Sequence, residues 1–75
     1  MSKPTRITNA IRALRFARGE MTQAELAQRI GVTRQTVIAI EQGRYSPSLE
    51  VAFQIARVLK VPLDEVFQYP EGEPR

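Results

Sequence analysis

Apolar residues recur at helical spacing through most of the chain, and glycine or proline interrupts each run. The first predicted helix ends at about Arg18 and places Ile7 and Ile11 on one face. Thr8 or Asn9 is expected to be its N-cap, because short polar side chains accept hydrogen bonds from the first backbone N–H groups of a helix. The pattern therefore predicts a helix close to the N-terminus.

A second helix is predicted to begin after Thr22 and to end at Gly31. Thr22 and Glu25 have the spacing of a capping box, in which each side chain accepts from the backbone of the other residue. Glycine commonly follows the last turn of a helix. The inner face of this helix is expected to comprise Ala24, Ala27 and Ile30, extended by Leu26.

A third helix is predicted between Thr33, as its cap, and Gly43. Val37 and Ile40 lie three residues apart and are expected to face the core. A fourth helix is predicted from about residue 49 to residue 60, after a cap at Ser48. Its apolar stripe would consist of Leu49, Ala52, Phe53, Ala56 and Leu59, with Ile55 beside it.

A last short helix is predicted from Pro62 to Phe67, because proline suits the first turn of a helix. No segment has the alternating pattern of a strand, so we expect an all-α fold of five helices. We expect a single domain over residues 1–75, with its core at about 7–67 and a flexible tail at 69–75.

Basic residues are concentrated in the first part of the chain. Residues 1–44 contain eight Lys/Arg and three Asp/Glu, whereas residues 45–75 contain three and five. A basic N-terminal half suits a polyanion such as nucleic acid, although a solvated basic face without a partner has the same composition.

The residue types exclude several kinds of site. The chain has no cysteine and no histidine, so disulfides are excluded and a structural zinc site would lack its usual ligands. Asp64 and Glu65 are adjacent in sequence and do not face each other on a helix, which makes them a poor catalytic pair. We expect no metal, no cofactor and no enzymatic activity. No apolar run suggests a membrane span or a signal peptide, so a cytoplasmic location is expected.

The stretch from Gln23 to Gln42 has the features of a helix-turn-helix, in which the first helix braces a second that projects. Ala27 is small enough for close approach of the two helices, and Gly31 tolerates the positive φ of a tight turn. Val37 and Ile40, six and nine residues after the glycine, would pin the second helix to the body. The outward residues of its first turn are Arg34, Gln35 and Thr36.

The chain resembles the Cro/C1-type, or XRE-family, helix-turn-helix regulators over about residues 7–67. The resemblance lies in MTQAELAQRIGVTRQTVIAIEQGRYSPSLEVAFQIARVLKVPLDEVF, most specifically in GVTRQTV, EQGR and PSLE. It implies a minimal, single-domain member with a five-helix lambda-repressor-like fold. Such a protein binds double-stranded operator DNA, usually as a homodimer on a palindromic site, to regulate transcription, and repression is the expected outcome.

The resemblance places Arg34 and Gln35 at base-contacting positions. The chemistry agrees, because Arg can pair with guanine and Gln with adenine in the major groove, although a solvated helix start would have similar residues. Ala39 lies one turn beyond Gln35 at a position that often reaches DNA, where alanine could touch only a thymine methyl. Ile38 could contact DNA or a neighbouring surface.

Thr22 and Gln23 open the second predicted helix, where free backbone N–H groups suit a phosphate. Gln23 matches the family's phosphate-clamping glutamine, and Thr22 could act both as cap and as phosphate contact. The other expected phosphate contacts are Thr33, Thr36 and Arg44. Weaker candidates, more typical of a solvated face, are Arg6, Arg12, Arg18 and Arg29.

Two further sets of residues have structural roles in this hypothesis. The resemblance implies an ion pair between Arg15 and Glu41, which would tie the first helix to the third; the alternative is two independent surface charges. Apolar residues in excess of what a small chain can bury suggest a dimer interface, although scattered surface apolars are also normal. The interface residues would be Val51, Val58, Phe67 and Tyr69.

The fold alone does not exclude a different class of function, because one fold serves many purposes. An antitoxin-like or other protein-interaction module is the alternative to a DNA-binding regulator. The polar tip of the third predicted helix argues against protein interaction as the only role. No segment suggests a domain that senses a small-molecule effector.

Overall fold

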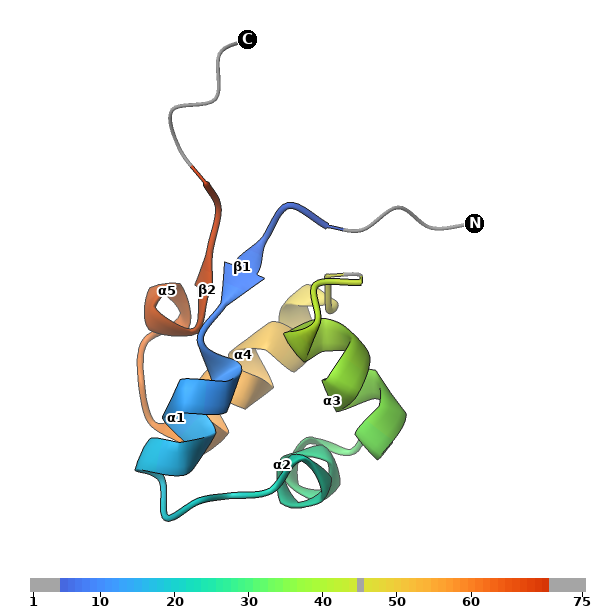
Figure 1. Ribbon diagram of the computed structural model, residues 1–75, viewed down its shortest axis with the longest axis vertical. Helices are drawn as coiled ribbons and strands as arrows, with labels where there is room; N and C mark the ends of the chain where they lie inside the picture. Colours follow the sequence, from blue (N-terminus) through green and yellow to red (C-terminus); the bar gives the residue numbers. More distant parts are fainter. Residues whose placement is uncertain (1–4, 45, 71–75) are drawn as a thin grey trace, which may run out of the picture.

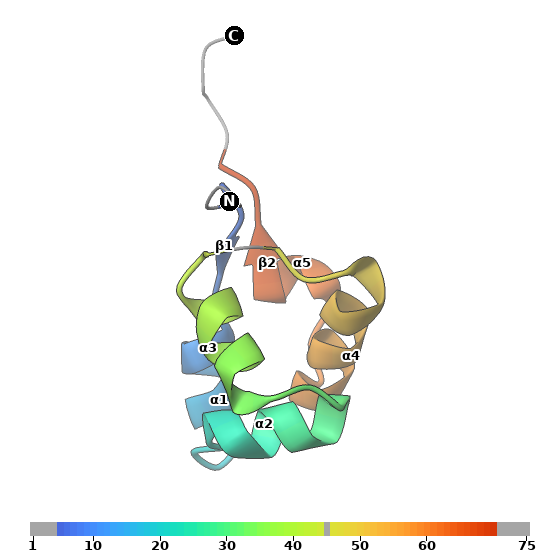
Figure 2. The ribbon, with the colours of Figure 1, turned by 90° about the vertical axis from the view of Figure 1, so that its right-hand side faces the viewer.

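The described residues, 5–44 and 46–70 of the computed structural model, form five helices and one very short antiparallel strand pair. Figures 1 and 2 show the strand pair at one end of the helix bundle and α2 at the opposite end. The elements are β1 (Thr8–Asn9), α1 (Ile11–Ala17), α2 (Gln23–Ile30), α3 (Arg34–Glu41), α4 (Leu49–Leu59), α5 (Leu63–Val66) and β2 (Phe67–Gln68).

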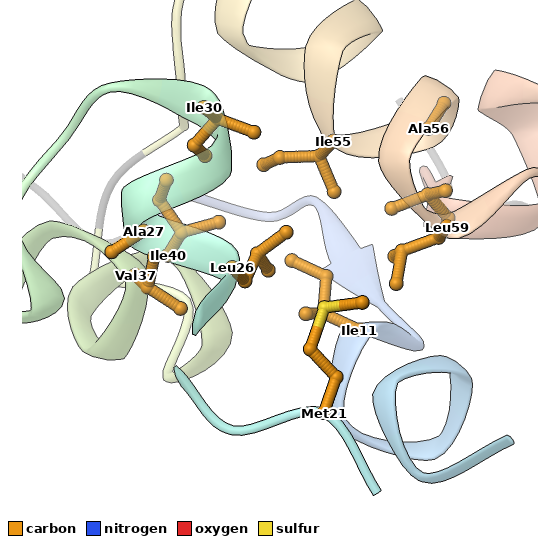
Figure 3. Close-up of a cluster of buried hydrophobic side chains, with 11 residues drawn as sticks. Ile11, Met21, Leu26, Ala27, Ile30, Val37, Ile40, Ile55, Ala56 and Leu59 are labelled. Atoms are coloured by element: carbon orange, nitrogen blue, oxygen red, sulfur yellow. The ribbon is translucent and has the colours of Figure 1, made fainter. Parts of the chain in front are cut away.

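One apolar cluster holds all five helices together (Figure 3). Its most completely buried large side chains are Ile11, Leu26, Ile40, Ile55 and Leu59, so α1, α2, α3 and α4 each contribute. Val66 adds α5 to the same core and is fully buried. The prediction of an all-α fold with five helices is therefore confirmed by the described residues, apart from the short strand pair.

Local signals set the helix ends largely as predicted. Thr22, Thr33 and Ser48 are the N-caps of α2, α3 and α4, and each side chain accepts from a backbone N–H three residues later. Gly31 follows α2 with φ 77°, a left-handed conformation that glycine adopts without steric cost. These ends depend on interactions within four residues, which is why the sequence predicts them well.

The N-terminal segment differs from the prediction. Ile7 precedes α1, and the residue at the N-cap position is Ala10. Residues 8 and 9 are extended because they pair with β2, Thr8 opposite Gln68 and Asn9 opposite Phe67. The expectation of no strand was therefore wrong, because two residues are too short to produce a recognisable alternation.

The inner faces of α2 and α4 also differ from the predicted stripes. Ala24 is exposed on α2. Leu49 and Phe53 of α4 are 69% and 55% exposed. The buried face of this helix consists of Ala52, Ile55, Ala56 and Leu59. The buried face of α4 is rotated toward Ile55 because α4 packs against α2 and α5 together. The last helix is shorter than predicted, since Pro62 is its N-cap and Phe67 belongs to β2.

Two substitutions on α4 test this rotation. Ile55→Ala removes a side chain that is 1% exposed and should lower the free energy of unfolding by about 2–5 kcal/mol through lost burial and a residual cavity. Phe53→Ala, two residues away, should change the stability of the folded monomer by roughly 0.5 kcal/mol or less. Urea denaturation at low protein concentration measures both, and a larger loss for Phe53→Ala would contradict the observed face.

Candidate nucleic-acid interface

The pair α2–α3 is built as a brace and a projecting helix. The hydroxyl Oγ1 of Thr22 accepts from the Glu25 backbone N–H at 3.0 Å, and Glu25 Oε1 accepts from the Thr22 N–H at 2.9 Å. After the turn at Gly31, the Val32 N–H donates to the Ala27 carbonyl at 3.0 Å. The predicted capping box and tight turn are thus present: the box fixes the start of α2, and the turn leads from the end of α2 into α3.

The first turn of α3 presents polar side chains to solvent. Thr33 Oγ1 accepts from the Thr36 N–H at 3.2 Å, and the two hydroxyl oxygens lie 3.0 Å apart. Arg34 and Gln35 are exposed, as predicted for residues that read bases. Buried Val37 and Ile40, at 1% and 2% exposure, anchor the opposite side of the helix.

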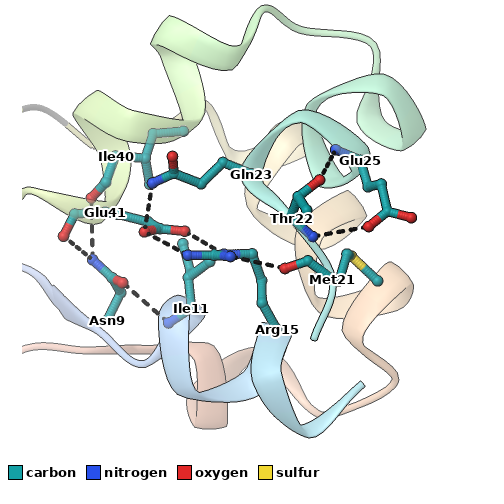
Figure 4. Close-up of polar contacts among 9 residues, drawn as sticks. All are labelled: Asn9, Ile11, Arg15, Met21, Thr22, Gln23, Glu25, Ile40 and Glu41. Carbon is teal, nitrogen blue, oxygen red and sulfur yellow. Dashed lines mark hydrogen bonds and ion pairs between the residues drawn. The ribbon is translucent and has the colours of Figure 1, made fainter. Parts of the chain in front are cut away.

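A buried ion pair links α1 to the end of α3 (Figure 4). Arg15 Nε donates to Glu41 Oε2 at 2.7 Å and Arg15 Nη2 to Glu41 Oε1 at 3.2 Å, and the two side chains are only 7% and 9% exposed. Arg15 Nη1 also donates to the Met21 carbonyl at 2.8 Å. The pair expected from the sequence is present, and its burial and bidentate geometry make it stronger than a surface pair.

Gln23 takes part in the same network. Its Nε2 donates to Glu41 Oε1 at 3.1 Å, so the amide connects the first residue of α2 to the last residue of α3. The side chain is half-buried. The glutamine assigned to a phosphate is thus already held by protein, and this contact fixes where its amide lies beside the helix start.

An open groove of about 1040 Å³ lies between α1, the start of α2 and α3. It brings together three of the predicted DNA contacts, because Thr22, Gln23 and Arg34 all line it. Arg12 and Phe16 line the α1 side, with the Arg12 guanidinium carbon 5.7 Å from the ring centroid of Phe16. The groove therefore has cations on both walls.

The remaining candidates are spread around α3. Thr33, Gln35 and Arg44 are exposed, whereas Thr36, Ile38 and Ala39 are half-buried. The side chain of Ala39 is a methyl group, so only this half-buried group is available for a contact with DNA.

The proposed dimer residues differ in exposure. Val51, Val58 and Phe67 are half-buried and pack against the core, while Tyr69 is 62% exposed. The exposed large apolar residues of the described chain are Phe16, Leu49, Phe53 and Tyr69. Sequence reasoning missed Leu49 and Phe53 because it placed them inside. The predicted flexible tail is described only through Pro70, and residues 71–75 lie outside the described residues.

Two other features, a metal-binding cluster and a membrane-spanning helix, are absent from the described residues. Residues 5–44 and 46–70 contain no group of three or more His, Cys, Asp or Glu side chains placed to hold a metal ion. In the same ranges, no helix has both the length and the apolar character needed to span a membrane.

The described fold, the braced polar helix and the glycine turn are the features of a helix-turn-helix domain. A family model described as helix-turn-helix, HTH_3, matches residues 11–66. The chain therefore belongs to the Cro/C1-type, or XRE, family of helix-turn-helix regulators, with its lambda-repressor-like all-α fold. This class consists of DNA-binding transcriptional regulators and is not a class of enzymes.

Three similar curated proteins are named as transcriptional regulators or as a transcriptional repressor. The chain is 49% identical over 53 residues to an uncharacterized HTH-type transcriptional regulator of Methanocaldococcus jannaschii, covering 71% of this chain and 80% of that protein. It is 43% identical over 63 residues to the HTH-type transcriptional regulator YgzD of Bacillus subtilis, covering 84% and 94%. It is 39% identical over 59 residues to the cryptic phage CTXphi transcriptional repressor RstR of Vibrio cholerae, covering 79% of this chain and 52% of RstR.

A solved structure supports the fold independently. A crystal structure of a Bacteroides fragilis protein named for DNA binding superposes with a TM-score of 0.72, covering 83% of this chain and 98% of that one. The sequence identity is 22%, so this likeness shows the arrangement of the helices.

Removing one partner of the buried ion pair should destabilise the protein. Glu41→Ala leaves the Arg15 guanidinium buried without its carboxylate and should lower the free energy of unfolding by about 3–5 kcal/mol. Glu50→Ala, at an exposed position in the first turn of α4, should cost less than about 1 kcal/mol. Denaturant unfolding compares the two variants.

The loss could come from the uncompensated charge of Arg15 or from the missing contacts of Glu41, and a double variant separates these two explanations. Arg15→Met combined with Glu41→Leu removes both charges and should recover part of the lost stability, because a buried pair can be replaced by apolar side chains at little net cost. If the double variant loses as much free energy of unfolding as Arg15→Met and Glu41→Leu lose when their separate effects are added, the uncompensated charge is not the cause.

Proposed function

We propose that this protein is a sequence-specific regulator of transcription that binds double-stranded DNA as a homodimer and represses its target genes. The observation that carries the proposal is the exposed polar start of α3, with Arg34 and Gln35 outward and Val37 and Ile40 buried behind them. A helix held in this way can enter a major groove without losing its contacts with the core. Similarity to the phage repressor RstR supports repression.

In this proposal Arg34 and Gln35 read bases, and Ala39 contributes at most a methyl contact. Arg34 can donate both arms of its guanidinium to a guanine, and Gln35 can donate to and accept from an adenine. The supporting evidence is their exposure at the start of α3 and the groove that Arg34 lines together with Thr22 and Gln23.

Phosphate contacts would position α3 in the groove. We assign them to Thr22 and Gln23 at the start of α2, Thr33 and Thr36 at the start of α3, and Arg44 just beyond α3. The assignment of Thr22 and Gln23 is supported by their place at the N-terminus of α2, where the backbone N–H groups favour an anion. Such contacts fix orientation and carry no sequence information.

A homodimer would place two α3 helices in successive major grooves, roughly 34 Å apart, on a palindromic operator. The interface is assigned to α4 and the C-terminal segment, through Val51, Val58, Phe67 and Tyr69. Tyr69 supports this assignment most, because a large aromatic side chain is exposed there. Residues 1–75 would act as a single DNA-binding domain with its core at about 7–67.

Substitutions at the tip of α3 test the reading role. Arg34→Ala and Gln35→Ala should each weaken binding to an operator selected from random DNA by about 1–3 kcal/mol and relax the preference at one base pair. Gln54→Ala, at an exposed position on α4, should bind as the wild type does. Wild-type affinity in both α3 variants would show that α3 is not the reader, and failure to enrich any DNA would favour a protein-interaction module.

The dimer is tested by sedimentation equilibrium over a range of protein concentrations. The average mass should rise from monomer to dimer with concentration, and Tyr69→Ser should shift that transition to higher concentration because it removes apolar area from the interface. Phe16→Ser, a change at a similarly exposed aromatic on α1, should leave the transition unchanged. A monomer mass at every concentration would overturn the homodimer.

A further inference from the structure

Asn9 makes three hydrogen bonds that join two helices far apart in the sequence (Figure 4). Its Oδ1 accepts from the Ile11 N–H at 3.1 Å, which satisfies the first backbone donor of α1. Its Nδ2 donates to the Ile40 carbonyl at 3.1 Å and, at a longer 3.4 Å, to the Glu41 carbonyl. The side chain therefore holds the start of α1 against the end of α3.

The backbone around Asn9 is itself held in place. Asn9 pairs with Phe67 in the two-stranded sheet, and the next N–H, of Ala10, donates to the Val66 carbonyl at 2.9 Å. Earlier in the segment, the Thr5 N–H donates to the Gly43 carbonyl at 3.2 Å, just beyond α3. Asn9 thus projects from a fixed backbone onto the last turn of α3.

The last carbonyls of a helix have no N–H partner within the helix. The Ile40 carbonyl accepts from the Gly43 N–H at 3.1 Å just beyond α3, and its second lone pair accepts from Asn9. Asn9 donates hydrogen bonds to the main chain of α3, whereas Arg15 donates to the side-chain carboxylate of Glu41. A contact to the main chain constrains the helix directly, whereas the ion pair constrains it through the side chain of Glu41. The two contacts therefore have different effects on the orientation of α3.

We propose that Asn9 is a positioning residue for DNA reading, which sets the angle of α3 through the main chain of its last turn. This inference rests on the proposed function. An eight-residue helix is about 12 Å long, so a tilt of about 10° at its end moves the tip by about 2 Å. A shift of that size breaks the hydrogen bonds of Arg34 or Gln35 to bases, because such bonds weaken steeply beyond their normal length.

Asn9→Ser separates this role from the hydrogen bond that Asn9 accepts from the Ile11 N–H at the start of α1. Serine retains an oxygen that can accept from the Ile11 N–H, but its side chain is too short to reach the carbonyls of Ile40 and Glu41. The measured quantity is the ratio of affinities for the selected operator and for unrelated DNA, well below the melting temperature of each variant. The ratio should fall on the order of tenfold, equivalent to about 1.4 kcal/mol.

Asn9→Asp provides a second variant of nearly the same shape. The carboxylate can still accept from the Ile11 N–H, but it cannot donate to the carbonyls of α3. Its charge weakens binding to all DNA alike, so the affinity ratio isolates the positioning effect and should fall as it does for serine. The control is Thr8→Ala, beside Asn9 on β1, which removes a 3.3 Å hydrogen bond to the Gln68 carbonyl of β2 and should leave the ratio unchanged.

The outcomes distinguish this inference from the proposed function. If the wild type prefers an operator and Arg34→Ala weakens that preference, an unchanged ratio in the folded Asn9 variants overturns the positioning role alone. A loss of thermal stability without a change in ratio has the same meaning, since it shows a purely structural contact. If the wild type has no preference among DNA sequences, the proposed function itself fails.

Discussion

The arrangement of this domain depends on one buried carboxylate, that of Glu41. It accepts two hydrogen bonds from Arg15 on α1 and one from Gln23 on α2, while belonging to the last turn of α3. Water is largely excluded from the pair, so an unpaired partner would be costly and the three helices have one favourable relative arrangement. Apolar contacts alone are less directional, and they permit small rotations that a bidentate ion pair does not.

Around this pair, each side of α3 has a separate task. Val37 and Ile40 bury the inner side, and Arg34 and Gln35 remain in solvent on the outer side. Such a division lets the surface chemistry vary without changing the core. It also explains how a fold shared at 22% identity with the Bacteroides fragilis protein can be maintained by different residues.

The C-terminal segment and the N-terminal arm meet at the strand pair, close to the end of α3. The side chain of Asn9 contacts α3, and the backbone of Asn9 pairs with Phe67. Asn9 therefore connects the segment to which a dimer interface is assigned with the proposed reading helix. Spacing between two reading helices and their tilt would then depend on neighbouring parts of the molecule.

Much of the fold was predictable because it depends on local interactions. The caps at Thr22, Thr33 and Ser48 and the turn at Gly31 involve residues within a few positions of one another, so their sequence pattern is sufficient. The family resemblance pointed to the Arg15–Glu41 pair, which spacing alone would not have identified. The exposed start of α3 followed from its polar residues.

Only the tertiary structure decided the contacts between distant segments. An asparagine near a helix start has the same local pattern whether or not its amide reaches Ile40, thirty-one positions away. The rotation of α4, which exposes Leu49 and Phe53, depends on which neighbours surround that helix rather than on its own apolar spacing. The sequence by itself determined the five helices, the caps of α2, α3 and α4, and the polar tip of α3. Their packing determined the angle at which that tip is presented, because the angle is a property of several elements together.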